Sequence, residues 1–125
     1  MQRTLLLSLG AILGANARYW IGIWAGTNLG TGFPYGTLIV NVVGCFLIGL
    51  FNALGETRFT ISPELRIFFT VGFLGSYTTF SSFGFETITL LRLGSPGLGI
   101  LNLLANLLAG FAAVVLGLYA GRLLS

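Results

Sequence analysis

The sequence predicts an all-α membrane protein with four transmembrane helices, of which the third is broken. Of the 125 residues, 55% are hydrophobic and only 7% are charged, whereas soluble domains carry about 25% charged residues. Four apolar runs each have the roughly 20 residues that a helix needs to cross a bilayer. Only the third run has a cluster of glycine, serine and threonine near its middle.

The small number of charges excludes several other classes of protein. Six arginines and three glutamates cannot cover a water-facing surface, which excludes a soluble globular domain. Cys45 is the single cysteine, so no intrachain disulfide framework can form. The scattered arginines form no basic patch, and we expect no nucleic-acid partner. The sequence also shows no nucleophile–base pair or metal-ligand cluster, which argues against an enzyme.

We expect residues 1–125 to form a single four-helix transmembrane domain. The first span covers about residues 5–24, and a turn-rich stretch separates it from the second, at about residues 35–54. A polar segment precedes the third span, at about residues 67–91, and a Gly-Ser-Pro-Gly turn precedes the fourth, at about residues 98–124. Because the loops are short, neighbouring helices must be antiparallel. Glycines spaced four apart permit close helix packing at positions 10 and 14, 22 and 26, and 117 and 121.

The arginines give only a weak preference for one orientation in the membrane. By the positive-inside rule, a small excess favours a cytoplasmic N-terminus. A strongly oriented protein has a larger excess, so insertion in both orientations stays open. The four arginines on the side of the N-terminus and the two toward the other side are, respectively, Arg3, Arg58, Arg66 and Arg122, and Arg18 and Arg92.

The middle of the third span carries the functional signal. Poor helix formers follow one another there, including Gly72, Gly75, Thr78 and Thr79, so we predict a helix break. Broken backbone at this depth is tolerated only inside protein or along a wet cavity. One helix end at such a break presents free N–H groups with partial positive charge, which suits an anion. The other end presents free carbonyl groups with partial negative charge, which suits a small cation.

The residues after the break favour an anion path built from neutral groups. Phe80 and Phe83 share one helical stripe, and their positive ring edges suit an anion. Thr79, Ser82 and Glu86 form a second stripe beside them. No acidic residue or histidine lies at a span centre, which disfavours a proton or cation path. Purely structural roles stay open for these positions. Phe80 and Phe83 could pack in the core, and Arg18 and Glu86 could anchor the chain at the membrane interface. Asn41, Ser81 and Ser82 could form contacts between helices.

Three segments resemble one family of membrane proteins, the Fluc (CrcB) fluoride channels of bacteria. They are GAILGANARY at residues 10–19, GTLIVNVVGCF at residues 36–46 and GFLGSYTTFSSFGFE at residues 72–86. The third motif is long and unusual in composition, so the joint match is specific. The fourth span also carries Asn102 and Asn106 but matches the family only in length and hydrophobicity.

The resemblance implies a fluoride-selective channel in the cell (inner) membrane. Passive, electrogenic export of fluoride would give resistance to fluoride toxicity. Family members are dual-topology, antiparallel homodimers with two narrow pores. The resemblance also implies one structural sodium ion at the two-fold axis, held by the backbone carbonyls of Gly75 and Thr78. It places Arg18 and Glu86 at the vestibules and assigns the fluoride pore to Asn41, Thr79, Phe80, Ser81, Ser82 and Phe83.

Two other classes of membrane protein compete with this interpretation. A small multidrug-type exporter needs an acidic residue in its first span, where this chain has Arg18 and no acid. A non-transporting membrane assembly subunit would account for the glycine-rich packing. It leaves the concentrated run of threonine, serine and phenylalanine at residues 78–83 without an explanation.

Overall fold

The structure, a computed structural model, describes residues 1–57 and 60–124, and it contains helices and no strands in those ranges. Arg58, which entered the count of charges, lies outside them. The prediction of an all-helical protein is therefore confirmed for the described residues. Its long helices are α1 (Gln2–Leu29) and α2 (Tyr35–Thr57), followed by two rods built from shorter pieces.

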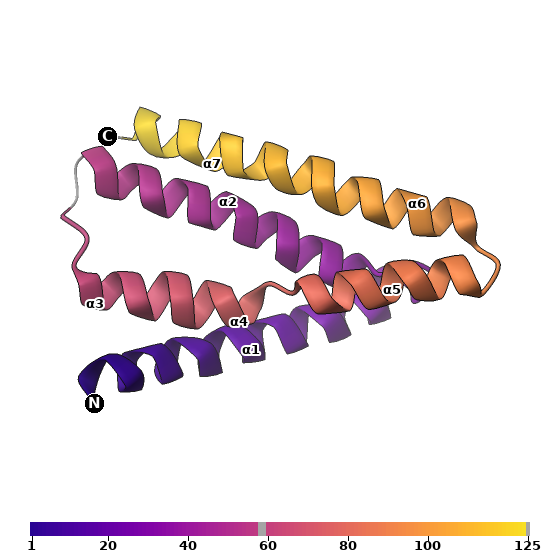
Figure 1. Cartoon of the computed structure of the whole chain (residues 1–125), viewed down its shortest axis with the longest axis horizontal. Helices are drawn as coiled ribbons and strands as arrows, with labels where there is room; N and C mark the ends of the chain where they lie inside the picture. Colours follow the sequence, from indigo (N-terminus) through magenta and orange to yellow (C-terminus); the bar gives the residue numbers. More distant parts are fainter. Residues whose placement is uncertain (58–59, 125) are drawn as a thin grey trace.

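These two rods complete an antiparallel arrangement with both termini at the same end (Figure 1). The first of these rods passes from α-helix to π-helix and back to α-helix, and it then breaks before its last segment. The other changes type without a break. The broken one, called the third rod below, consists of α3 (Pro63–Arg66), η1 (Ile67–Leu74), α4 (Gly75–Tyr77) and α5 (Phe80–Arg92). The other, called the fourth rod, consists of α6 (Pro96–Leu104), η2 (Ala105–Ala109) and α7 (Gly110–Leu123). The η segments are π-helical, a wide turn that often accompanies functional sites.

Three helical stretches are long and apolar enough to cross a membrane: Gln2–Leu29, Tyr35–Glu56 and Pro96–Leu123. The rod from α3 to α5 is not among them because the break divides it into shorter helices. Large apolar side chains cover the outer faces, including Trp20, Leu108 and Leu116. Lipid is the environment that such a surface requires, since soluble monomers rarely expose large apolar patches.

Glycines bring the helix backbones into close contact at two of the three predicted pairs. A Cβ added to Gly14 would collide with the backbone carbonyl of Phe73 on η1. A Cβ added to Gly117 would collide in the same way with the Phe46 carbonyl on α2. By contrast, a Cβ at Gly22 would meet nothing within 4 Å. Close packing therefore concentrates where α1 meets η1 and where α2 meets α7.

The break lets one rod pack against two different neighbours. Before the break, η1 and α4 lie against α1, whereas α5 lies against α6 after it. Tyr77, the last residue of α4, is 4% exposed and belongs to a core cluster with Val40 and Leu74. Its ring stacks on Phe73, with ring centroids 5.6 Å apart. This bulky residue therefore anchors the end of the first half in the core.

We expect Gly14→Ala to destabilise the fold more than Gly22→Ala. The added methyl group at Gly14 strikes a backbone carbonyl that cannot rotate away, and overpacking of this kind costs about 1–3 kcal/mol. The free energy of unfolding in detergent micelles measures both variants. Gly22→Ala is the matched control on the same helix, and equal losses in the two variants would contradict the packing described above.

Candidate functional site

The predicted break is present at Thr78 and Thr79. Both residues are extended, with φ −86° and ψ 161° at Thr78 and φ −154° and ψ 113° at Thr79. Gly72 and Gly75 remain within helical turns, so the break begins three residues after the last of these glycines. Helical bonding persists up to the Thr78 N–H, which donates to the Leu74 carbonyl at 3.0 Å.

Asn41 on α2 pairs with the extended backbone of Thr79. Its Oδ1 accepts the Thr79 N–H at 2.8 Å, and its Nδ2 donates to the Thr79 carbonyl at 3.1 Å. An extended residue presents its N–H and carbonyl on the same side, which allows this two-point contact. Nδ2 also donates to Asn106 Oδ1 at 2.9 Å. Both amide hydrogens of Asn41 are thus engaged within the chain, and its role as a pore donor stays a prediction.

The Thr79 side chain caps α5 and gathers nearby hydroxyl groups. Its Oγ1 accepts the Ser82 backbone N–H at 3.2 Å, which satisfies one of the free N–H groups at the start of the helix. Thr79 Oγ1 also donates to Ser82 Oγ at 3.0 Å and lies 3.4 Å from Ser81 Oγ. The structure therefore brings together Thr79, Ser81 and Ser82, three hydroxyl residues that the resemblance assigns to the fluoride pore.

Phe80 and Phe83 contact each other at the start of α5. Their ring centroids are 5.5 Å apart and the rings meet edge to face at 69°. Phe83 is buried, whereas Phe80 is 78% exposed in the single chain. The predicted pair is thus in contact, and an anion box formed by the ring edges stays a prediction.

Arg18 and Glu86, the two predicted vestibule residues, make separate contacts. Arg18 Nη1 donates to the Thr78 carbonyl at 3.4 Å, which is long for a charge-assisted hydrogen bond. Glu86 Oε1 accepts the Thr37 hydroxyl at 2.7 Å. Its second oxygen, Oε2, is buried and has no partner among the described residues. The arginine thus lies at the break, and the glutamate lies along α5 beside the start of α2.

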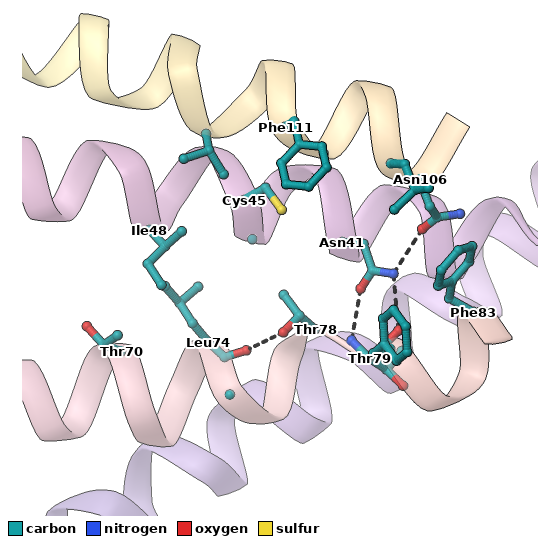
Figure 2. A pocket seen from close by; sticks show the side chains of 16 residues that line it. Asn41, Cys45, Ile48, Thr70, Leu74, Thr78, Thr79, Phe83, Asn106 and Phe111 are labelled. Carbon is teal, nitrogen blue, oxygen red and sulfur yellow. Dashed lines mark hydrogen bonds between the residues drawn. The ribbon is translucent and has the colours of Figure 1, made fainter. Parts of the chain in front are cut away.

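A groove of about 470 Å³ runs beside the break between α2, η1 and the fourth rod. Asn41, Thr79 and Phe83 lie toward one end of it, as Figure 2 shows. Ile48 and Leu74 lie toward the other end and make that end apolar. The groove therefore joins the polar groups of the break to an apolar surface of the chain.

A second polar cluster joins the break to the fourth rod, and the sequence did not predict it. Asn106 Nδ2 donates to Asn102 Oδ1 and to the Asn102 carbonyl, both at 3.0 Å. Asn102 Nδ2 then donates to Thr87 Oγ1 at 2.9 Å. Two asparagines four residues apart in an apolar span are the signal that could have indicated it, because buried amides require partners.

An all-helical fold with apolar outer faces and a polar helix break inside defines this chain as a membrane protein. The family described as CrcB-like protein, Camphor Resistance (CrcB), matches residues 5–118. The chain belongs to this family, which confirms the resemblance found in the sequence.

Relatives across the whole chain support the same assignment. A protein of Chloroflexus aurantiacus named Fluoride-specific ion channel FluC is 44% identical over 124 residues, covering 98% of this chain and 97% of the relative. Proteins of the same name from Acidobacterium capsulatum and Rhizobium etli are 44% and 43% identical. The match to the Acidobacterium protein covers 97% of both chains, and the match to the Rhizobium protein covers 100% of both.

We expect Thr79→Ala to destabilise the protein by about 1 kcal/mol, the usual loss for removing a helix N-cap. Thr79→Ser keeps the hydroxyl that accepts the Ser82 N–H, so it should retain most of the stability. Thermal or denaturant unfolding in detergent compares the two variants. If serine and alanine were equally destabilising, the hydroxyl would not be the group that caps α5.

Proposed function

We propose that this protein is a fluoride-selective ion channel that conducts fluoride passively and electrogenically. The observation that carries this proposal is the similarity along the whole chain to relatives named as fluoride-specific ion channels. In the cell (inner) membrane, such a channel lets fluoride leave the cell and so gives resistance to fluoride toxicity. The chemistry of the break supports the proposal because neutral hydroxyl and amide donors gather there, beside the guanidinium group of Arg18.

The proposed fluoride path follows the residues around the break. Fluoride is small and strongly hydrated, so fixed donors must replace its water, as in other selectivity filters. Hydroxyl groups can donate by rotating about the Cβ–Oγ bond. Arg18 and Glu86 belong to the vestibules in this proposal, and the path itself is lined by Asn41, Thr79, Ser81 and Ser82 with the ring edges of Phe80 and Phe83.

We also propose that the channel is an antiparallel homodimer with dual topology. Four packed helices fill their own centre, so a pore needs a second chain. The open groove beside the break and the exposed Phe80 ring support a partner at this face. The small excess of arginines at one end is compatible with insertion in both orientations.

A sodium ion fits the carbonyl groups at the break, and we propose Gly75 and Thr78 as its ligands. The helical partner of the Gly75 carbonyl would be the Thr79 N–H, which bonds to Asn41 instead. Gly75 is also exposed in the single chain. Among the described residues, the Thr78 carbonyl accepts only a long bond from Arg18, and it keeps a second lone pair. Unwound carbonyls of this kind hold sodium in other membrane proteins.

Purified protein in liposomes should release fluoride when a potassium ionophore dissipates the voltage. Without the ionophore, release should stall because uncompensated charge builds up across the membrane. A fluoride electrode measures the efflux, and chloride-loaded vesicles provide the selectivity control. Fluoride release no faster than from vesicles without the protein would refute the proposed function.

We expect Phe80→Ile to slow fluoride efflux by about tenfold while the protein stays folded. The substitution removes the ring edge, and aromatic contacts are worth roughly 0.5–1.5 kcal/mol, of which the upper value corresponds to about tenfold. Phe85→Ile is the matched control, because Phe85 lies on the same helix and is similarly exposed, at 75% against 78%. Equal efflux from both variants would return Phe80 to a packing role.

A further inference from the structure

A single chain of hydrogen bonds runs from the break through the fourth rod and back to α5. Every donor in it points the same way. Asn41 donates to Asn106, Asn106 to Asn102, and Asn102 to Thr87. The Thr87 hydroxyl then donates to the Phe83 carbonyl at 2.8 Å. This hydrogen-bond chain therefore joins α2, η2, α6 and α5 through amide and hydroxyl groups.

Backbone groups determine the direction of this chain. The Thr79 N–H can only donate, so the oxygen of the Asn41 amide must face it and the nitrogen must face Asn106. The Asn102 carbonyl can only accept, so the nitrogen of Asn106 must face it. Each amide thus has one orientation that satisfies all of its contacts, and neighbouring members enforce it on one another.

Burial makes each link of the chain difficult to lose. Asn102 is 0% exposed, so water cannot replace a missing partner there, and Asn106 is 8% exposed at the edge of the groove. Two asparagines outside this hydrogen-bond chain behave differently. Asn16 and Asn28 are exposed, and each donates to a carbonyl four residues earlier on its own helix. Unlike those two exposed residues, Asn102 and Asn106 are buried and also bond to other helices, Asn102 to Thr87 on α5 and Asn106 to Asn41 on α2.

We propose that Asn102 and Asn106 are positioning residues that act through Asn41 to hold the break extended. The Thr79 N–H has left the helical ladder, and the Asn41 amide replaces its lost acceptor. Asn106 in turn fixes the Asn41 amide, and Asn102 fixes Asn106. At its other end, the hydrogen-bond chain reaches α5 at Thr87, whose hydroxyl bonds to the Phe83 carbonyl in the first turn of the same helix.

Amide hydrogen exchange at Thr79 tests this proposal. Asn102→Leu has a similar volume but can neither donate nor accept, so the Asn41 amide loses its support. We expect exchange of the Thr79 N–H to rise about tenfold, the effect of weakening one net hydrogen bond. Exchange in α7 should stay unchanged, as should Thr79 exchange in the control Asn16→Leu. Unchanged Thr79 exchange in folded Asn102→Leu protein would overturn the proposal.

A pair of milder variants tests the same chain if Asn102→Leu fails to fold. Thr87→Val keeps the shape of the side chain but removes the hydroxyl that Asn102 needs. Thr87→Ser restores that hydroxyl. We expect faster Thr79 exchange with valine and nearly native exchange with serine. Equal behaviour of the two variants would show that packing at Thr87, and not the hydrogen-bond chain, affects the break.

A double-variant comparison separates positioning from general destabilisation. If Asn102 acts through Asn41, adding Asn102→Leu to Asn41→Leu should not increase Thr79 exchange further. If the two effects multiply, the residues act independently and the proposal is wrong. Exchange is measured without fluoride, so a failure of the proposed channel function leaves this test intact. Fluoride efflux from the single variants then shows whether the position of the break controls conduction.

Discussion

Backbone hydrogen bonding inside the bilayer is the constraint on which the structure depends. Lipid offers no partner to an N–H or carbonyl group, so a helix can break there only where protein replaces the lost bonds. At this break, Asn41 satisfies both backbone groups of Thr79. The Thr79 hydroxyl then begins the next helix by accepting the Ser82 N–H. Two side chains thus allow two residues to leave the helix.

The break in turn organises the packing around it. The half before it can lie against α1 because small residues at Gly10 and Gly14 let the backbones approach. The half after it lies against α6, where Asn102 and Thr87 connect the two helices. The close, apolar contact and the polar contact are therefore on opposite sides of the break. This division leaves the groove beside the break open for a partner.

The sequence was sufficient for the helical class and for the existence of the break. Hydropathy and the run of small and hydroxyl residues indicate both. The exact position of the break was not predictable, because Gly72 and Gly75 have poor helix propensity yet remain helical. Asn41, far away in the sequence, selects Thr79 as the residue that leaves the ladder. The role of Asn102 was hidden for the same reason, since it depends on how α6 lies against α5.

The two kinds of donor at the break differ in how easily they can serve an anion. A hydroxyl such as that of Thr79 or Ser82 can turn toward a passing ion without moving its helix, because only one bond rotates. Asn41 cannot give up an amide hydrogen without releasing either the Thr79 carbonyl or Asn106. An anion that bound Asn41 strongly would therefore loosen the break that forms its own path. In a fluoride channel built this way, the hydroxyl groups and ring edges would make the closest contacts with the moving ion, while Asn41 lines the path and holds the break in position.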